Sequence, residues 1–392
     1  MRLSIKYSTV FSSLMLFLFF FPISYATRTT VLLKYIAICI AGIITIAKGR
    51  QHYFTACCKF YYLCICYFIY ILIISAANHL EYANLENVFS VIIFAVALVF
   101  FVTSLRRDEE SFINAVHFVF AVYIIWDLMT LVMFPDGIPG KESIYGAQFL
   151  FGNKNNHTMQ LLVYLFSAVW KCKFDRKWDK LTLILSVSIS FATIILLGSS
   201  TTTVSIGIAI IGVILFWVGV DKASINSGIV VAGGLGMTIL ILLGQATFLA
   251  PIVNRFGKDM TFTTRTDIWV KAIPKIAEKP ILGWGNIAGD EATELLGSIN
   301  THNQLLDSML SGGLVLLTIL LMVLFMIAKS ANRIYDKNMK STVNFFLIAL
   351  LIKMMFEQIA SASIAWFFFM LLYEYSMVQN RTYIRRSNID KG

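Results

Sequence analysis

Charge and cysteine are both scarce in this sequence. Charged residues make up only 14% of the 392 positions, whereas 58% are apolar. Together with a mean hydropathy of +0.76, this composition excludes an ordinary soluble globular protein. The six cysteines lie in apolar stretches or at their basic edges, and Cys64 and Cys66 lack the paired spacing of a zinc site. We therefore expect the cysteines to be small packing residues, and we expect neither a metal nor a cofactor.

Long apolar runs occupy most of the chain. Such a run can cross about 30 Å of hydrocarbon as an α-helix, and it is far longer than the alternating strands of a membrane barrel. The sequence therefore predicts an all-α polytopic membrane protein, with residues 1–392 forming a single integral membrane domain that has no internal repeat. We expect about twelve transmembrane helices, near 9–26, 31–47, 53–77, 85–104, 112–134, 158–171, 181–198, 203–220, 228–250, 305–328, 342–359 and 361–378.

The formal net charge of +10 is placed in alternate connections between these runs. Lys and Arg stay on the cytoplasmic side of a membrane, so the pattern predicts that both termini are cytoplasmic and that the 251–304 connection lies outside. A surface that binds DNA would not alternate with membrane spans, so we exclude a nucleic-acid partner. The first run resembles a cleavable signal segment, but we expect it to be an uncleaved span because eleven more follow. The basic residues concerned are Arg2, Lys6, Lys48, Arg50, Lys59, Arg106, Arg107, Lys171, Lys173, Arg176, Lys177, Lys180, Lys222, Lys329, Arg333, Lys337, Lys340, Arg381, Arg385, Arg386 and Lys391.

The large outer loop at 251–304, between the ninth and tenth spans, is the place where we expect chemistry. Residues 264–277 have a helical pattern that puts Arg265, Trp269 and two apolar residues on one face, with Thr263 or Thr264 as the cap. Arg265 would lie in the first turn of this helix, where backbone N–H groups and the helix dipole favour an anion.

Two residues of this loop have both a functional and a plain interpretation. Arg265 either binds a phosphate or pyrophosphate through its guanidinium fork or is a solvated loop arginine. His302 either is a general base near neutral pH or caps a helix at the membrane interface. The turn at Pro280, Gly283 and Gly285 lacks a following Lys-Ser/Thr pair, so we expect an ordinary turn rather than a phosphate-binding loop.

Charged residues inside the apolar runs are costly and are therefore candidates for function. They are Asp127, Lys353 and Glu357, and we expect the last two, four residues apart on one helix, to pair with each other. A proton or ion pathway is the alternative, and it would make the protein a transporter.

The ordered combination of motifs resembles the O-antigen ligase/polymerase superfamily of bacterial envelope glycosyltransferases. The shared pattern is Arg-x-x-x-Trp in an outer loop, then Pro-x-x-Gly-x-Gly, then His-Asn at the start of a span, with Gly-Asn-Lys-Asn upstream. In this sequence the pattern corresponds to Arg265, Trp269, Pro280, Gly283, Gly285, His302, Asn303 and residues 152–155. The resemblance covers about residues 145–330. One departure is that many members have Ser-Arg where this chain has Ser199-Ser200-Thr201.

The resemblance implies a metal-independent glycosyltransferase, similar to the GT-C class, that works outside the cytoplasmic membrane. Its donor would be an oligosaccharide on undecaprenyl pyrophosphate, in agreement with the lack of an Asp-x-Asp motif and of a nucleotide-sugar fold. Arg265 and His302 would be catalytic. Either Arg255 or Lys154 would replace the missing arginine, or the anion site is built differently here. The substrate-binding residues would be Asn303, Trp269, Lys154, Asn155 and Arg255.

Three functions remain open, and the acceptor of the glycan separates the first two. We favour a polymerase of O-antigen, exopolysaccharide or capsule, which adds the glycan to a lipid-linked repeat unit, because the Gly-Asn-Lys-Asn segment is similar to polysaccharide polymerases. The alternatives are an O-antigen ligase, which transfers the glycan to lipid A-core, and a transporter or flippase of lipid-linked glycan. The resemblance also implies a multi-pass protein of the bacterial inner membrane, with the lipid bilayer, a flippase and a chain-length regulator as partners.

Overall fold

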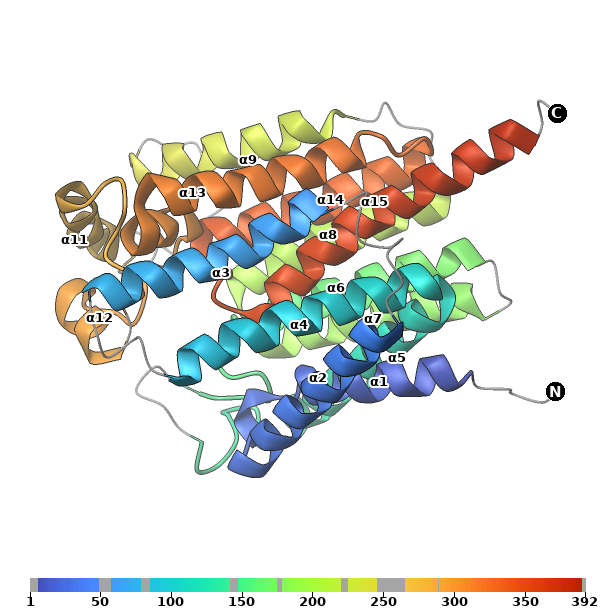
Figure 1. Cartoon of the computed structure of the whole chain (residues 1–392), viewed down its shortest axis with the longest axis horizontal. Coiled ribbons are helices and arrows are strands. Elements are labelled where there is room, and N and C mark those ends of the chain that lie inside the picture. Colours follow the sequence, from blue (N-terminus) through green and yellow to red (C-terminus); the bar gives the residue numbers. More distant parts are fainter. Residues whose placement is uncertain are drawn as a thin grey trace.

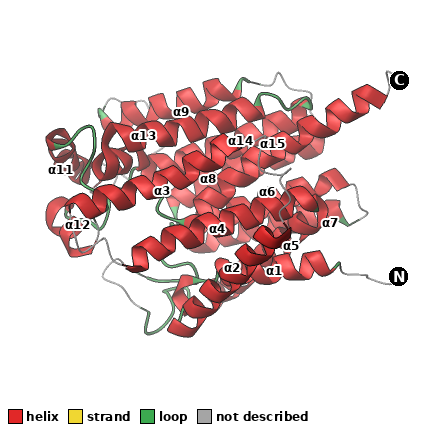
Figure 2. Cartoon of the chain, viewed as in Figure 1, coloured by secondary structure: helices red, strands yellow, loops and turns green. Residues whose placement is uncertain are grey.

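A computed structural model describes residues 6–48, 58–78, 85–141, 147–174, 178–219, 225–244, 265–287 and 289–389. Within these residues the regular elements are helices, and the one β-type contact is an isolated bridge between Phe149 and Gly152 (Figure 2). The all-α prediction is confirmed for the described part of the chain. Arg255 and the expected caps Thr263 and Thr264 lie outside the described residues.

A helix overlaps each of the twelve predicted spans. Of the helices described, α3, α4, α5, α7, α8, α13 and α14 are the seven that are long and apolar enough to cross a membrane. This confirms a multi-pass architecture, whereas the number twelve stays a prediction. The helices are α1 (Tyr7–Phe19), α2 (Arg28–Lys48), α3 (Cys58–Asn78), α4 (Leu85–Arg107), α5 (Glu109–Met133), α6 (His157–Lys171), α7 (Asp179–Leu197), α8 (Ser200–Val218), α9 (Ser227–Leu242), α11 (Arg265–Glu278), α12 (Gly289–Leu296), α13 (Gln304–Ala331), α14 (Lys337–Phe356) and α15 (Ser363–Ile389).

The long helices run side by side, and the two short helices α11 and α12 lie together at one end of the bundle (Figure 1). We call this the α11 end. Helix α1 begins and α15 ends at the opposite end, so the two described termini are on the same side (Figure 1). That shared side agrees with the alternation of the basic connections, while the orientation in the membrane stays a prediction.

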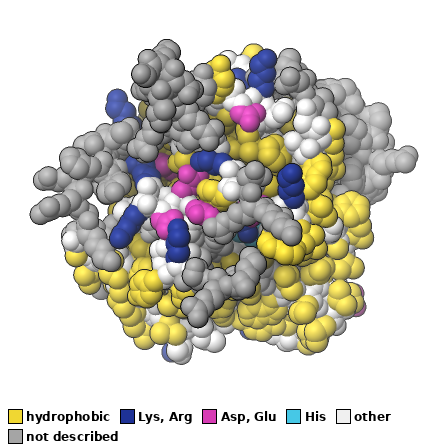
Figure 3. Space-filling model, turned by 90° about the vertical axis from the view of Figure 1, so that its right-hand side faces the viewer, with side chains coloured by type: hydrophobic (Ala, Val, Ile, Leu, Met, Phe, Trp, Pro, Cys, Tyr) yellow, Lys and Arg dark blue, Asp and Glu magenta, His cyan; other side chains and the backbone are white. Residues whose placement is uncertain are grey.

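The end opposite to α11 carries a group of basic and acidic side chains, with hydrophobic side chains around it (Figure 3). Arg106 of α4 and Glu374 of α15 form a buried ion pair there, and Tyr61 donates to the same carboxylate at 2.6 Å. Lys173 pairs with Glu109 at 2.7 Å. The Arg106–Glu374–Tyr61 contacts join α3, α4 and α15. The Lys173–Glu109 pair joins α5 to the segment that follows α6.

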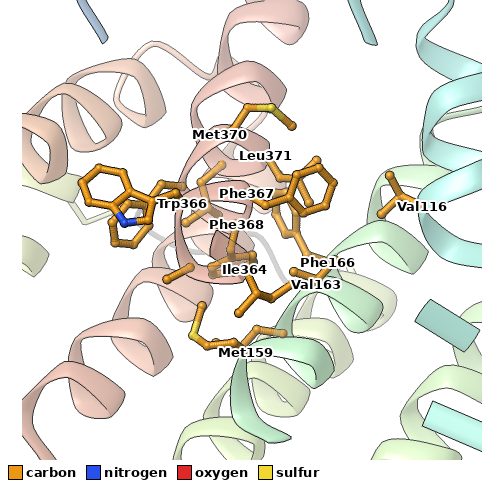
Figure 4. Close-up of a cluster of buried hydrophobic side chains, with 14 of the residues drawn as sticks. Val116, Met159, Val163, Phe166, Ile364, Trp366, Phe367, Phe368, Met370 and Leu371 are labelled. Carbon is orange, nitrogen blue, oxygen red and sulfur yellow. The ribbon is translucent and has the colours of Figure 1, made fainter. Parts of the chain in front are cut away.

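The core of the bundle is built around α15. Its residues Ile364, Trp366, Phe367 and Phe368 are buried. Figure 4 shows Ile364 and Phe368 on the side that faces Val163 and Phe166 of α6, and Trp366 on the opposite side. Because α15 is apolar on all sides along this stretch, it is packed by neighbours on every side rather than lying at the surface. Helix α1 also belongs to the bundle, since Phe20, which follows it, packs on Phe367.

Candidate active site

The Pro280–Gly285 turn crosses a break in α13. At Gly313 the backbone of α13 leaves helical geometry, with φ 58° and ψ −157°. The turn binds the backbone groups around this break: the Trp284 N–H donates to the Leu310 carbonyl at 2.9 Å, and the Gly285 N–H to the Ser311 carbonyl at 2.8 Å. These N–H groups are therefore already bonded, which agrees with an ordinary turn rather than a phosphate-binding loop.

Glycine is required at this crossing because the two backbones touch. Gly283 has φ +76°, and a Cβ at this position would lie 2.4 Å from the Gly312 nitrogen. A Cβ on Gly313 would lie 2.3 Å from the carbonyl carbon of Ile281. Gly283 of the turn and the Gly312-Gly313 pair of α13 are thus the two sides of one contact, and this contact fixes the 280–285 turn against α13.

Helix α11 forms as the sequence predicts. Its residues Trp269, Ala272 and Ile276 are buried on one face, and the helix continues through Pro274 to Glu278. Trp269 is only 3% exposed, and its indole N–H donates to the Thr301 carbonyl at 2.9 Å. Trp269 therefore contacts the backbone of the residue just before His302.

His302 has the one positive φ, 48°, among the described residues other than glycine. Its N–H donates to the Asn300 side chain at 2.9 Å, and Trp269 holds the preceding carbonyl. A left-handed backbone costs a residue with a Cβ roughly 1–2 kcal/mol, and such strain is concentrated at functional sites. The cap of α13 is Asn303 rather than His302, so the helix-cap interpretation of His302 is wrong.

Asn303 is fully buried and its side chain is bonded within the protein. Its Oδ1 accepts from the N–H groups of Leu305 and Leu306, and its Nδ2 donates to the Met355 carbonyl at 2.9 Å. These bonds place the start of α13 against the end of α14. The predicted contact of Asn303 with substrate stays a prediction.

Glu357 joins the predicted site residues. Helix α14 ends at Phe356, and Glu357 follows it in extended geometry with its side chain 9% exposed. Oε1 accepts from Arg265 Nη2 and, in a second bond, from Asn155 Nδ2, each at 2.7 Å. Oε2 lies 3.2 Å from His302 Nδ1. One carboxylate thus contacts Arg265 and His302 from the 251–304 loop and Asn155 from the segment before α6.

Asn155 lies in the segment that precedes α6 and is held by residues from other parts of the chain. Its Oδ1 accepts from the Ser199 hydroxyl at 2.7 Å, and its backbone carbonyl accepts from Lys353 Nζ at 2.7 Å. Two residues further on, His157 bonds to Asp127 of α5 at 3.0 Å in a fully buried pair. Asp127 therefore anchors the Asn155 segment.

The departure from the family pattern lies beside Asn155. Ser199 caps α8 by accepting from the Thr202 N–H, and the Thr202 hydroxyl lies 2.9 Å from that of Thr158 in α6. The 199–203 segment thus places hydroxyl groups beside Asn155, where the resemblance led us to look for an arginine.

Lys353 and Glu357 do not form the direct ion pair that we expected. Because Glu357 has left the helix, the spacing of four residues no longer puts the two side chains on one face. The Lys353 ammonium instead donates to the Asn155 carbonyl. Lys154 is exposed next to Asn155, which keeps it a candidate second cation.

The charges of the site determine its protonation. Burial would raise the pKa of Glu357, but Lys353, the bond from His302 and Arg265 outweigh burial and lower the pKa to about 2. Burial lowers the pKa of Arg265, and the guanidinium nevertheless stays protonated. An ionised carboxylate only accepts, so His302 Nδ1 carries the proton and a neutral ring has Nε2 as its acceptor.

The structure therefore brings together Arg265, His302 and Asn155, and it adds Glu357, which our sequence analysis did not place in the site. The sequence marks Glu357 as a costly charge in an apolar run, but we expected it to pair with Lys353 rather than with Arg265 and His302.

Comparison with known families gives a match at residues 185–321 to the family described as O-antigen ligase. Comparison with curated proteins finds no match. The matched segment extends from α7 into α13 and includes Arg265, the 280–285 turn and His302, whereas Asn155 and Glu357 lie outside it. Residues 185–321 thus match a family of the same superfamily that the motifs of the sequence resemble.

Proposed function

We propose that this protein is a polysaccharide polymerase of the outer face of the bacterial cytoplasmic membrane. It transfers a glycan from undecaprenyl pyrophosphate to a lipid-linked repeat unit, without a metal ion, and its termini are cytoplasmic. The observation that carries the proposal is the contact of Arg265 and His302 with one carboxylate, Glu357, at the α11 end. The match to the O-antigen ligase family supports the same class of chemistry.

The geometry suits His302 as a general base. Glu357 accepts from Nδ1 and so fixes the tautomer in which Nε2 takes a proton. In the reaction an acceptor hydroxyl attacks the anomeric carbon, its proton passes to Nε2, and the carbon–oxygen bond to the pyrophosphate breaks. The carboxylate then stabilises the imidazolium that forms, as an acidic partner does for other catalytic histidines.

The same geometry suits Arg265 as the group that binds the leaving pyrophosphate. Negative charge on the pyrophosphate grows as the bond to the sugar breaks, so a fixed guanidinium stabilises the transition state more than the bound donor. Lys154, which is exposed beside Asn155, is a further cation for the same anion, whereas the buried Lys353 bonds to the Asn155 carbonyl. Arg255 stays a proposed substrate contact.

Trp269 and Asn303 support the reacting groups in this proposal. Trp269 bonds to the carbonyl before His302, and Asn303 joins α13 to the end of α14 just before Glu357. Both thereby fix the distance between His302 and Glu357. Their predicted contacts with sugar hydroxyls would come from substrate bound beside them.

A ligase is the second candidate, because the matching family is described as O-antigen ligase. The two functions share the donor and the chemistry and differ in the acceptor. A purified protein that lengthens lipid-linked repeat units without lipid A-core is a polymerase. One that requires lipid A-core is a ligase.

The test of the proposal is Arg265→Ala in cells that lack the native gene. We expect loss of long polymer on a gel at matched protein level, with partial recovery in Arg265→Lys because an ammonium lacks the bidentate fork. Lys271→Ala is the matched control, since Lys271 is exposed on the same helix. Normal polymer from the Arg265→Ala variant would contradict the proposal.

A further inference from the structure

The anion-binding groups of this site are already occupied by the protein's own carboxylate. Glu357 Oε1 takes the Arg265 and Asn155 donors, each at 2.7 Å. Carboxylate and phosphate oxygens bind a guanidinium in the same way. A phosphate that uses Arg265 must therefore first displace Glu357.

We propose that Glu357 makes the site selective for a pyrophosphate over the singly charged phosphate headgroups of the membrane. Glu357 fills the anion position of the empty enzyme, and only the donor's pyrophosphate has enough charge to displace it from Arg265 and Asn155. This inference rests on the proposed function, since it assumes that Arg265 binds the donor pyrophosphate.

The need for such selectivity follows from the position of the site. A cationic site at the end of a membrane bundle lies close to phospholipids, whose phosphodiester headgroups also bind arginine. Anionic phospholipids such as phosphatidylglycerol carry about one negative charge, and a pyrophosphate diester carries about two. Glu357 lowers the apparent affinity of Arg265 for both ligands by the same factor. A weakly bound headgroup then no longer fills the site at its membrane concentration, whereas the more highly charged pyrophosphate still binds.

The remaining contacts allow the exchange without an unpaired buried charge. Lys353 interacts electrostatically with Glu357 and is only 3% exposed, so it continues to neutralise the carboxylate after Arg265 has turned to the donor. The Arg265 side chain is 16% exposed, whereas that of Glu357 is 9% exposed. The arginine is thus the more accessible partner of the pair, and it begins α11.

The exchange also connects donor binding to the base. While Arg265 is paired with Glu357, it shares the negative charge that stabilises a protonated His302. When the donor takes Arg265, that charge acts on His302 more fully. Donor binding thereby prepares His302 to accept the proton of the attacking hydroxyl.

Binding of inorganic pyrophosphate to the purified full-length protein tests the exchange. We expect Glu357→Gln to bind it roughly tenfold or more tightly than the wild type, because the two bonds to Oε1 that the ligand must break are no longer charge-assisted. We expect the same variant to turn over donor more slowly, since His302 has lost its carboxylate. Glu357→Asp, which keeps the charge on a shorter side chain, should have an intermediate affinity and covers the case in which Glu357→Gln does not fold.

The selectivity is tested in nanodiscs with and without phosphatidylglycerol. Added phosphatidylglycerol should weaken pyrophosphate binding in Glu357→Gln and leave it nearly unchanged in the wild type. Glu278→Gln is the control, because Glu278 is exposed on α11 and pairs only with Lys275 in the described structure. Equal or weaker pyrophosphate binding in Glu357→Gln, with binding still abolished by Arg265→Ala, would overturn this inference alone. Unchanged binding in Arg265→Ala would overturn the proposed function as well.

Discussion

Replacement of His302 by Ala and by Gly separates its chemical role from its backbone role. Both changes remove the imidazole and its contact with Glu357. If His302 is the general base, each change should lower turnover roughly 10²–10⁴-fold. The backbone responds differently, because φ is 48° at this position. Ala is strained in this left-handed backbone and Gly is not. Gly loses more conformational entropy on folding, and after this loss is subtracted we expect the Gly variant to be more stable than the Ala variant by about 0.5–1 kcal/mol.

The assay pairs a thermal unfolding midpoint with turnover of a purified lipid-linked repeat unit for each variant. His302→Asn is the third variant, since Asn tolerates a left-handed backbone and donates to a carboxylate but cannot accept a proton there. We expect the Gly and Asn variants to unfold at higher temperature than the Ala variant, with all three nearly inactive. Activity that returns in the Gly or Asn variant, in step with stability, would show that His302 only shapes the loop and would refute its role as a base.

Three further predictions test the packing and the topology. Gly283→Ala should cost about 2 kcal/mol or more of stability, because its Cβ would clash with the backbone at the α13 break. Gly140→Ala is the control: Gly140 also has a positive φ, +72°, but a Cβ there would have nothing within 4 Å, so this change should cost less in the same unfolding assay. Arg106→Ala leaves the buried Glu374 without its cationic partner, so the thermal midpoint should fall by the equivalent of about 3–5 kcal/mol. Turnover per folded molecule should be unchanged, and its loss would show that the two ends of the bundle are coupled. A cysteine at exposed Asp290, in a background without the native cysteines, should react with a membrane-impermeant thiol reagent in intact spheroplasts, and labelling only after lysis would reverse the predicted orientation.

Much of the architecture follows from patterns that are local in the sequence. Apolar runs of sufficient length predict helices wherever they occur, and a helix is found in each predicted range. The α11 helix was predictable for the same reason, because Trp269, Ala272 and Ile276 share a face. Arg265 and His302 could be selected because they are polar residues in segments where the chain has little other reason to be polar.

The assembly of the site could not be predicted from such patterns. Asn155 and Glu357 are 202 residues apart, and their contact depends on how α6 and α14 pack. The expected pairing of Lys353 with Glu357 failed because it assumed that α14 continues past Phe356, whereas the helix ends there. The bond of Trp269 to the carbonyl before His302 likewise depends on the path of the backbone, which hydropathy does not encode.

Reconstituted glycan transfer tests the central claim most directly. The purified protein is given a defined repeat unit on undecaprenyl pyrophosphate, with and without a chelator, and both products are measured. The account predicts lengthened lipid-linked glycan and one released undecaprenyl pyrophosphate for each new glycosidic linkage. Both products should be unaffected by the chelator and lost in Arg265→Ala and in His302→Ala. Transfer that continues at the wild-type rate in both variants, or no release of undecaprenyl pyrophosphate by the active wild type, would contradict it.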